Sequence, residues 1–412
     1  MPHPRLMSTS IRPIAALVIV AVLGAQPGAR LQERSGAPGV VAIPFELAGR
    51  HIIVKVTVGS SRPLSFVFDT GAHAAIIRLE VAKELGLRLE GEARTGGAGP
   101  GTQIGSQVRG ARWSLVGLSG VAQPLTLALP LPEPSPAAGR PLDGIIGGEF
   151  IREFVVELDY QAKGFRLHKP ESFRYTGSGE SIPIDFVNVS HPTVAATVTP
   201  VGGQALERRF MLDVGSGLAL ALHSPFVDEQ NLLGPDSKTI RAIGGAGAGG
   251  RVTGRLGRVE SLQIGSFTIG RPITMFAQDK AGAFANAALA GNIGAQIAMR
   301  FRLYLDYGRR RIILEPSPRF SEPFDRAFSG LAMRAYGPDY RTFRVTDVLE
   351  DSPATEADIR QEDVITAVND IPASQLTLAT ILAMFERPAT YTLTIRRDQR
   401  TFTVSLTPRR LI

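Results

Sequence analysis

The sequence predicts a mainly β protein, built from two tandem homologous β-barrel lobes and a smaller α+β unit at the C-terminal end. Three observations support this fold class. Short runs rich in valine and isoleucine alternate with turns, and the counts of Gly (44) and Pro (29) are both high. That composition is typical of strands joined by many turns. The chain also carries an internal repeat, and its 412 residues are too many for one ordinary domain.

The repeat predicts one lobe over residues 40–170 and a second over residues 180–316. Residues 43–47 (IPFEL) recur as residues 182–186 (IPIDF), and each half then contains an apolar run that ends in aspartate and is soon followed by glycine. The two halves also end alike, with seven identities at a constant separation of 147 residues. These are Gly144, Ile146, Gly147, Phe154, Leu158, Asp159 and Tyr160, which match Gly291, Ile293, Gly294, Phe301, Leu305, Asp306 and Tyr307.

Local patterns predict the elements inside each lobe. Alternating apolar residues favour strands, as at Ile52, Val54 and Val56, and a helical pattern follows each aspartate run. The predicted elements are strands at 51–58 and 193–198, closing hairpins at 157–167 and 304–314, and helices at 78–85 and 224–232. Residues 130–141 form a Pro-rich surface loop, and residues 169–181 and 315–324 are linkers.

The last unit, residues 325–412, has a different pattern. A strand is expected around Phe343–Val345, followed by Ser352-Pro353-Ala354 and an apolar strand at 364–368. A helix is predicted over 376–385 and two further strands over 391–396 and 401–406. This mixture indicates a small α+β domain.

The N-terminus predicts a signal peptide over residues 1–29. Arg5 and Arg12 provide positive charge, residues 14–25 form an unbroken apolar core, and small residues follow. That core is shorter than the roughly 20 residues that span a bilayer. We therefore expect a periplasmic or secreted protein, anchored in the inner membrane if the signal is retained. The chain has no cysteine, which excludes disulfides and thiolate chemistry.

Charge and composition bear on other classes of function. The net charge is +7, but the basic residues are scattered, with Arg309-Arg310-Arg311 the longest run, so nucleic-acid binding is not expected. No two histidines have metal-ligand spacing, and the glycine-rich segments lack the Lys-Ser/Thr of a phosphate-binding loop. No metal or cofactor is predicted.

The repeated aspartates, Asp69 and Asp213, point to paired-carboxylate chemistry. Two carboxyl groups about 3 Å apart cannot both ionise cheaply, so they share a proton. The ionised group can take a proton from water, and the protonated group can donate to a carbonyl oxygen. Gly71 and Gly215 let the chain turn sharply beside the partner lobe. Asp159 and Asp306, which are also repeated, each precede a turn and are interpreted as structural.

These motifs resemble those of aspartic proteases, in particular retropepsin-like bacterial members that carry a PDZ domain. Residues 67–72 (VFDTGA) keep the family signature, and residues 144–147 match its second apolar–glycine element. The resemblance implies a bilobal acid-protease fold with Asp69 and Asp213 as the catalytic pair. Support from the two loops is implied for Thr70, Gly71, Ala72, Val214, Gly215 and Ser216, and flaps over the substrate are implied for Gly96, Gly97, Gly244 and Gly245.

Val214 departs from the family pattern, which has threonine or serine there. We expect weaker clamping between the lobes and a mildly acidic pH optimum rather than a dead site. The first hypothesis is an endopeptidase acting on polypeptide substrates. Two alternatives remain open: a lapsed protease fold that binds peptides through its PDZ domain, and a working site formed between two molecules.

The C-terminal unit resembles a PDZ domain through the run from Val348 to Asn369. The resemblance implies a groove for a C-terminal peptide, expected between the strand at 343–348 and the helix at 376–385. The residues expected to bind the peptide are Tyr336, Gly337, Tyr340, Phe343 and Val345. A domain that only packs, with a blocked groove, is the alternative.

Overall fold

The computed structural model describes residues 40–412 except 133–134, 136–137, 236 and 244. The predicted signal peptide lies outside the described residues. Within the described part of the chain, no helix is long and apolar enough to cross a membrane. The fold is mainly β, as the sequence predicts, and its strands form two large sheets, a sheet shared between them and a separate C-terminal sheet.

The first lobe is built around an eight-stranded sheet in the order β2-β3-β4-β9-β5-β8-β7-β6. The predicted strand at 51–58 is β3, and the predicted helix is α1. The elements are β1 (Val40–Pro44), β2 (Glu46–Ala48), β3 (His51–Val58), β4 (Leu64–Phe68), β5 (Ala75–Arg78), α1 (Leu79–Glu84), β6 (Leu89–Thr95), β7 (Gln103–Leu115), β8 (Leu118–Leu129), β9 (Gly144–Ile146), α2 (Gly148–Arg152), β10 (Val155–Asp159) and β11 (Gly164–His168).

The second lobe repeats this plan, and its main sheet runs β17-β20-β23-β16-β24-β15-β14-β21-β22 with β13 beside β14. Its elements are β12 (Glu180–Pro183), β13 (Asp185–Val187), β14 (His191–Thr199), β15 (Leu206–Asp213), β16 (Leu220–Leu222), α3 (Ser224–Glu229), β17 (Ile240–Arg241), β18 (Ala246–Gly247), β19 (Gly250–Arg251), β20 (Gly254–Arg258), β21 (Ser261–Ile264), β22 (Phe267–Gly270), β23 (Ile273–Ala277), η1 (Ala283–Ala285), β24 (Gly291–Gly294), α4 (Ala295–Ala298), β25 (Phe301–Asp306), η2 (Tyr307–Arg309) and β26 (Arg311–Pro316).

The two lobes are joined by a six-stranded sheet to which both contribute, in the order β1-β11-β10-β25-β26-β12. At its centre β10 pairs antiparallel with β25, so that Val156 lies opposite Leu305. The predicted closing hairpins are β10–β11 and β25–β26. Buried residues of both lobes, such as Phe165 and Phe301, belong to one continuous hydrophobic core. The lobes therefore pack as a pair about this sheet.

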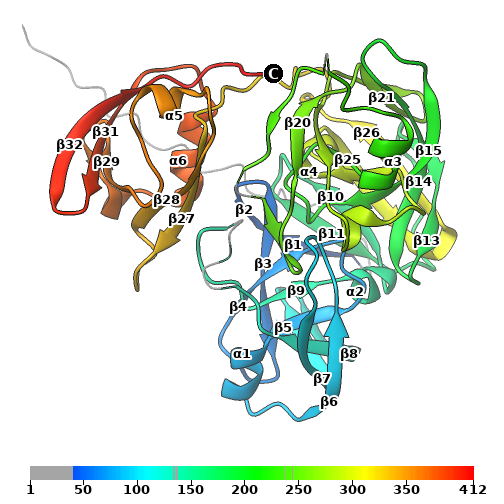
Figure 1. Ribbon diagram of the computed structural model, residues 1–412. Coiled ribbons are helices and arrows are strands. Elements are labelled where there is room, and N and C mark those ends of the chain that lie inside the picture. The colour runs from blue at the N-terminus through cyan, green and yellow to red at the C-terminus, as the bar shows by residue number, and fades with distance from the viewer. Residues whose placement is uncertain (1–39, 133–134, 136–137, 236, 244) are drawn as a thin grey trace, which may run out of the picture.

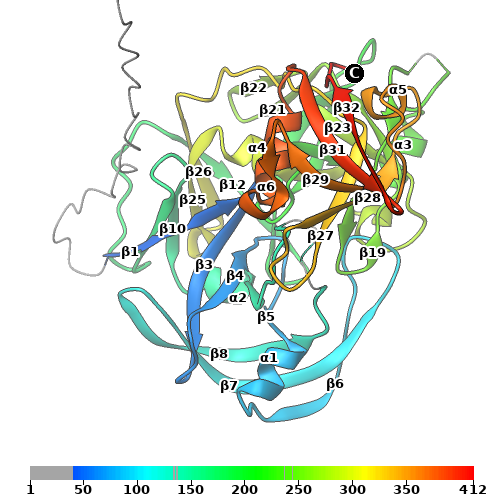
Figure 2. The same cartoon turned by 90° about the vertical axis from the view of Figure 1, so that its left-hand side faces the viewer.

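The C-terminal unit forms its own sheet, in the order β27-β28-β29-β31-β32, over a separate core. Figures 1 and 2 show it (orange to red) beside the second lobe and above the first. Its elements are β27 (Leu331–Tyr336), β28 (Thr342–Val348), α5 (Pro353–Glu356), β29 (Val364–Val368), β30 (Ile371–Pro372), η3 (Ala373–Gln375), α6 (Leu378–Phe385), β31 (Tyr391–Arg397) and β32 (Arg400–Leu406).

Side chains from both lobes hold this unit in place. Arg50, in the turn between β2 and β3, and Arg326, in the linker between β26 and β27, both bond the carboxylate of Glu386 at the end of α6, at 2.5 and 3.1 Å. Arg241 and Arg251 of the second lobe both bond Asp347 of β28.

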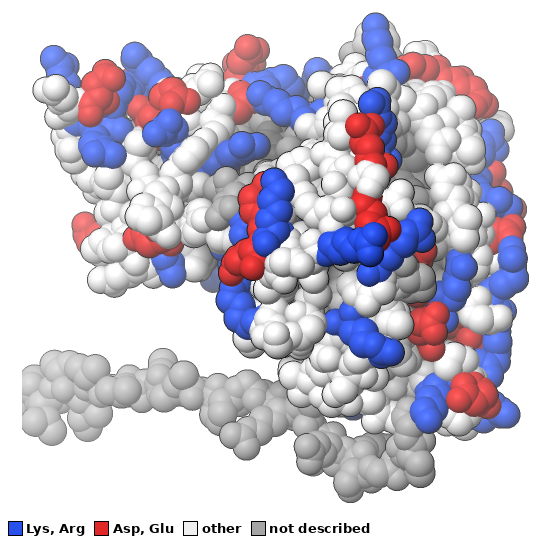
Figure 3. Space-filling view, turned by 90° about the horizontal axis from the view of Figure 1, so that it is seen from below, with Lys and Arg blue, Asp and Glu red and all other residues white. Residues whose placement is uncertain are grey.

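The charged surface is otherwise mixed. On the face in Figure 3, basic side chains are interspersed with acidic ones rather than gathered in a stripe.

Candidate active site and peptide groove

Matching strand pairs place the two aspartates. Strand β4 lies parallel to β9, and the amide of Asp69 donates to the carbonyl of Ile146 at 3.0 Å. Strand β15 lies parallel to β24, with Asp213 opposite Gly294. Residues 66–68 and 210–212 are buried, so each apolar run anchors its strand in the core and presents an aspartate at the strand's end. The duplicated sequence pattern thus becomes a duplicated geometry.

The structure brings Asp69 and Asp213 together within a single chain, with the carboxyl group of each against the glycine that follows the other. The two glycines that follow them permit this approach. A Cβ at Gly215 would lie 2.2 Å from Cγ of Asp69, and a Cβ at Gly71 would lie 2.8 Å from Cγ of Asp213. Any side chain at either glycine would push the carboxyl groups apart, which accounts for the glycine in both motifs.

The two carboxyl groups differ electrostatically. Burial raises the pKa of both above the ordinary value of aspartate, and the charge of Asp213 raises the pKa of Asp69 further. The side-chain amide of Asn292 lowers the pKa of Asp213, and it favours the negative charge of the pair on Asp213. Because they are coupled, the two groups titrate as a pair.

The donors around each carboxylate explain this difference. Asp69 accepts from the amide of Gly71 at 2.7 Å. Asp213 accepts from the amide of Ser216 at 3.0 Å.

Asp213 has a further donor: Nδ2 of Asn292 bonds its Oδ2 at 2.9 Å. Asn292, in β24, was not among the predicted site residues. The sequence marks it, because an amide stands where the first lobe has the apolar Ile145. The ionised form of Asp213 is therefore better stabilised than that of Asp69.

One hydroxyl links the two active-site loops, residues 69–72 and 213–216. Oγ1 of Thr70 donates to the carbonyl of Leu212 at 2.6 Å and accepts from the amide of Val214 at 3.0 Å. Val214 is fully buried and packs in the shared core. The link therefore comes from the first lobe alone, as expected for a valine in the second motif.

The glycine-rich segments of the two lobes meet at their tips. The amide of Gly101 donates to the carbonyl of Gly249, and the amide of Gly249 donates to the carbonyl of Ala98, both at 2.7 Å. Gly97 lies in this contact, since its Cβ would come 2.8 Å from that of Ala248. Gly96 is exposed and meets nothing.

The second tip is built from β18 and β19, which Gly245 precedes; Gly244 lies outside the described residues. The first tip also contacts the second lobe elsewhere, because the amide of Ala283 donates to the carbonyl of Gly97 at 3.0 Å. Backbone bonds thus join the two segments, and the side chain of Gln103 adds a bond from its Nε2 to the carbonyl of Ala248 at 2.7 Å.

Other acidic residues have structural partners. Asp143 is buried, accepts from the amide of Ser65 at 2.8 Å, and pairs with Arg62 and Arg78. Asp159 accepts from the amides of two turn residues, and Asp306 pairs with Arg311. Within the described residues, no group of three or more His, Asp or Glu side chains could hold a metal ion.

Comparison with known families fits this geometry. Residues 54–150 match the family model described as aspartyl protease, a span that includes Asp69 and the 144–147 element. The first lobe is similar to the aspartyl proteases. Residues 321–407 match the PDZ domain model. No curated protein matches the chain. The chain thus combines an aspartyl-protease-like region with a C-terminal PDZ domain.

The PDZ domain does not place its groove where the sequence analysis expects it. Strand β28, which carries Phe343 and Val345, is paired on both sides, with β27 and with β29, and both side chains are fully buried. A peptide cannot add to a strand whose two edges are already bonded. The expected groove beside β28, with Tyr336, Gly337 and Tyr340 at its end, is therefore wrong.

The free edge belongs to β27, which the sequence analysis did not predict. Across the described residues, β27 pairs with β28 alone, and α6 packs beside it. Ala379, Leu382, Ala383 and Glu386 of α6 line one wall of a cavity of about 550 Å³, and the segment from Phe328 to Leu331 lines another. This arrangement of edge strand, helix and loop is what a peptide-binding groove requires.

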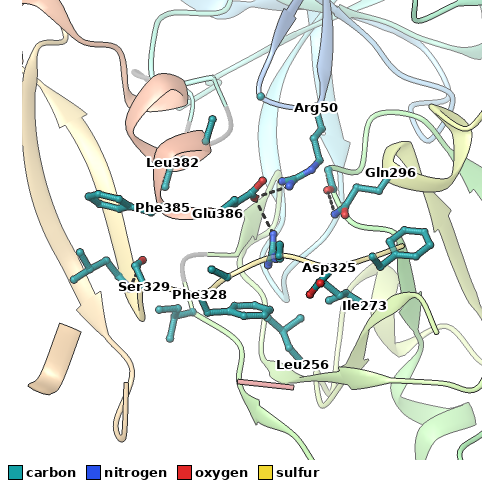
Figure 4. A pocket seen from close by; sticks show the side chains of 18 of the residues that line it. Arg50, Leu256, Ile273, Gln296, Asp325, Phe328, Ser329, Leu382, Phe385 and Glu386 are labelled. Atoms are coloured by element: carbon teal, nitrogen blue, oxygen red, sulfur yellow. Dashed lines mark hydrogen bonds and ion pairs between the residues drawn. The ribbon is translucent and has the colours of Figure 1, made fainter. Parts of the chain in front are cut away.

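The same cavity reaches the protease-like lobes (Figure 4). Its far wall includes Arg50 and the loop that follows Asp213, at Gly217, whose carbonyl accepts from Gln296 at 2.9 Å. Leu382 is 37% exposed, which leaves an apolar side chain available in this space. The groove of the PDZ domain therefore opens toward the lobes and not away from them.

Proposed function

We propose that the protein is an aspartic endopeptidase. In the proposed reaction the carboxylate of Asp213 takes a proton from water, which attacks the carbonyl carbon of a peptide bond. Asp69 donates its proton to the carbonyl oxygen, and the resulting tetrahedral intermediate breaks down to two peptides. The observation that carries the proposal is the close approach of two carboxyl groups, one from each lobe.

The surroundings of the pair support this chemistry. The raised pKa values keep one proton on the pair, so that acid and base coexist over a range of pH. Asp69 and Asp213 are each partly accessible to solvent, so water can reach them. The glycine-rich tips provide backbone groups that an extended substrate can bond.

An active-site substitution tests the proposal. Purified protein is incubated with a heat-denatured protein substrate from pH 3 to pH 8, with and without pepstatin, and the fragments are mapped by mass spectrometry. Cleavage is expected in the wild type and loss of at least 100-fold in Asp69→Asn. Asp143→Asn, which changes a buried carboxylate outside the pair, serves as the control and is expected to retain cleavage. Absence of wild-type cleavage at every pH would refute the proposal.

A peptide-binding protein without turnover is the second candidate, and the observation that favours it is Val214. The missing hydroxyl leaves the loops linked from one side only. In that case Asp69→Asn would leave peptide binding unchanged, and the wild type would show no cleavage above that of the variant. The assay above separates the two candidates.

We also propose that the groove between β27 and α6 binds the C-terminal tail of a polypeptide substrate or partner. The unpaired edge of β27 supports this proposal, because a peptide can add to it as a further strand. Fluorescence anisotropy with labelled peptides that end in an apolar residue provides the test. Leu382→Lys is expected to weaken binding at least tenfold. Ile371→Lys, at a similarly exposed site on β30, should leave it unchanged; equal effects would contradict this site.

Export to the periplasm or the medium is a further part of the proposal and is based on the sequence of residues 1–29. Cell fractionation of the full chain, with detection at the C-terminal end, checks it. Deletion of residues 2–29 should retain the protein in the cytoplasm. Equal fractionation of both chains would contradict export by this segment.

A further inference from the structure

A chain of buried polar groups runs from Asp213 into the second lobe. Nδ2 of Asn292 bonds Asp213, and Oδ1 of Asn292 lies 2.9 Å from Nε2 of His223. Nδ1 of His223 lies 3.1 Å from the carbonyl oxygen of Asn286. His223 is fully buried and Asn292 is 4% exposed. Two buried polar side chains thus stand behind one of the two aspartates.

Among the described residues of the first lobe, no equivalent chain of hydrogen bonds is present. Ile145 occupies the position of Asn292, and it packs against an apolar cluster that includes Val67. Arg78 ends β5, as His223 follows β16, and it pairs with Asp143. This chain of hydrogen bonds therefore distinguishes the two lobes and is not required by the fold that they share.

The donors and acceptors in this chain of hydrogen bonds are compatible with two arrangements of protons on His223 and Asp213. A backbone carbonyl only accepts, so Nδ1 of His223 carries a hydrogen. With Nδ2 of Asn292 toward Asp213, Oδ1 accepts from Nε2, which requires a charged imidazolium and favours an ionised Asp213. Rotating the amide of Asn292 by 180° requires a neutral imidazole and a protonated Asp213. A neutral imidazole beside an ionised Asp213 leaves two acceptors facing each other in either orientation.

We propose that Asn292 and His223 are positioning residues that couple the charge of His223 to that of Asp213. In the charged state they hold the negative charge of the pair on Asp213 and leave the proton on Asp69. This inference deepens the proposed function, on which it rests for its catalytic meaning. The coupling itself is a property of the hydrogen bonds and can be measured without turnover.

Within the described residues, His223 is linked by hydrogen bonds to one ionisable group, Asp213, through Asn292. The ring of Phe284 in η1 meets it edge-on, with centroids 5.7 Å apart. On α3, Asp228 and Glu229 are exposed.

The acidic residue that follows β23 has its own partner. Asp279 accepts from the amide and the hydroxyl of Thr253, both at 2.9 Å. Burial lowers the pKa of His223 overall, and the bonds to Asn286 and Asn292 and the charge of Asp213 oppose this lowering. A neutral group in place of Asp213 would therefore lower that pKa further.

The first test uses kcat/KM as a function of pH with the denatured substrate. Asn292→Leu removes a donor from ionised Asp213, so the acidic limb is expected to move up by about one pH unit or more. His223→Gln keeps a hydrogen-bonding partner that cannot be charged, and it should move the limb in the same direction. Ile145→Leu, the matched position in the first lobe, is the control. A loss of rate with no displacement of the limb would overturn the proposal.

The second test does not depend on activity. Nitrogen-15 NMR of the imidazole groups follows the titration of His223 in the full chain, and the signal is identified by its loss in His223→Gln. Asp213→Asn is expected to lower the pKa of His223 by at least one unit, and Asn292→Leu should remove that dependence. An unchanged titration in Asp213→Asn would overturn the coupling. An inactive wild type with the coupling intact would refute the endopeptidase but not the coupling.

Discussion

At the scale of the residue, the pair of aspartates is held in an unequal environment. Thr70 supplies the one side-chain hydroxyl between the active-site loops, and Asn292 supplies a donor to Asp213 that Asp69 lacks. Both differences lie on single side chains, while the strands that carry them match. A symmetric fold thereby gives its two carboxyl groups different properties.

The raised pKa of Asp69 predicts a pH-dependent stability. In the unfolded chain this group titrates near 4, so between that value and its higher folded value the folded state binds the proton more tightly. Its contribution to stability is then full at low pH and is lost as the pH rises through this window. Asparagine is neutral and keeps the shape of the protonated carboxyl. Asp69→Asn is therefore expected to gain stability relative to the wild type on going from pH 4 to pH 7.

Thermal unfolding at several pH values measures this gain, and each unit of pKa difference corresponds to about 1.4 kcal/mol. Asp228→Asn, at an exposed carboxylate on α3, provides the control and should show no such trend. If the difference between Asp69→Asn and the wild type were the same at pH 4 and pH 7, the assigned direction would be incorrect.

At the scale of the element, the contact between the glycine-rich tips depends on the absence of side chains. Gly99 has φ +90°, and a Cβ there would lie 2.6 Å from the carbonyl carbon of Gly249. Gly99→Ala is expected to separate the tips, because strained backbone of this kind costs about 1–3 kcal/mol. Hydrogen exchange at the amides of Gly101 and Gly249 should accelerate about tenfold.

Gly96→Ala is the matched control for that experiment. It lies in the same segment, but a Cβ there meets nothing within 4 Å. Exchange at the same two amides should be unaffected. Equal acceleration in both variants would show that the segment responds to any substitution, rather than to the loss of the close approach.

Several elements could be predicted from sequence, and the reasons for the failures are physical. The alternation at Ile52, Val54 and Val56 predicts β3 because burial on one face leaves a period of two. Strand β27 was missed because residues 331–336 alternate weakly, and its pairing with β28 follows from tertiary contacts. Without β27, the sequence analysis places the groove beside β28, although the free edge belongs to β27.

The candidate site could likewise be predicted only in part. The pairing of Asp69 with Asp213 was predictable because the repeat places them in equivalent strands. His223 was not, because a lone histidine gives no spacing that indicates a partner, and its bonds to Asn286 and Asn292 come from distant segments. Asn292 did stand out in the sequence, as an amide in an otherwise apolar element, but nothing local showed what it contacts.

At the scale of the whole molecule, a small charge cluster ties the PDZ domain to the lobes. Glu386 pairs with Arg50 of the first lobe and with Arg326 of the linker, and burial lowers the pKa of Arg326 to about 10. The same carboxylate lies at the end of the groove wall. The attachment of the domain and the opening of its groove therefore involve the same residue.

Glu386→Gln is expected to loosen the PDZ domain. Two guanidinium groups would lose their charged partner, at a cost of about 1.5–3 kcal/mol. Small-angle scattering should show a larger radius of gyration, and the linker around Arg326 should become more sensitive to protease. Glu260→Gln, which breaks an exposed pair with Arg271, is the control, since such pairs contribute about 0–1 kcal/mol. An unchanged radius in Glu386→Gln would contradict this role.

The hydroxyl of Thr70 is one reason why the two halves of the repeat are not interchangeable. Two copies of the second half would bring two valines together and leave the loops without that bond. Two copies of the first half would lack the amide behind either carboxylate. Each half therefore supplies a group that the other lacks, the bridging hydroxyl from the first and the amide behind the carboxylate from the second. Exchanging either half for a copy of its twin would make the surroundings of the two carboxyl groups alike.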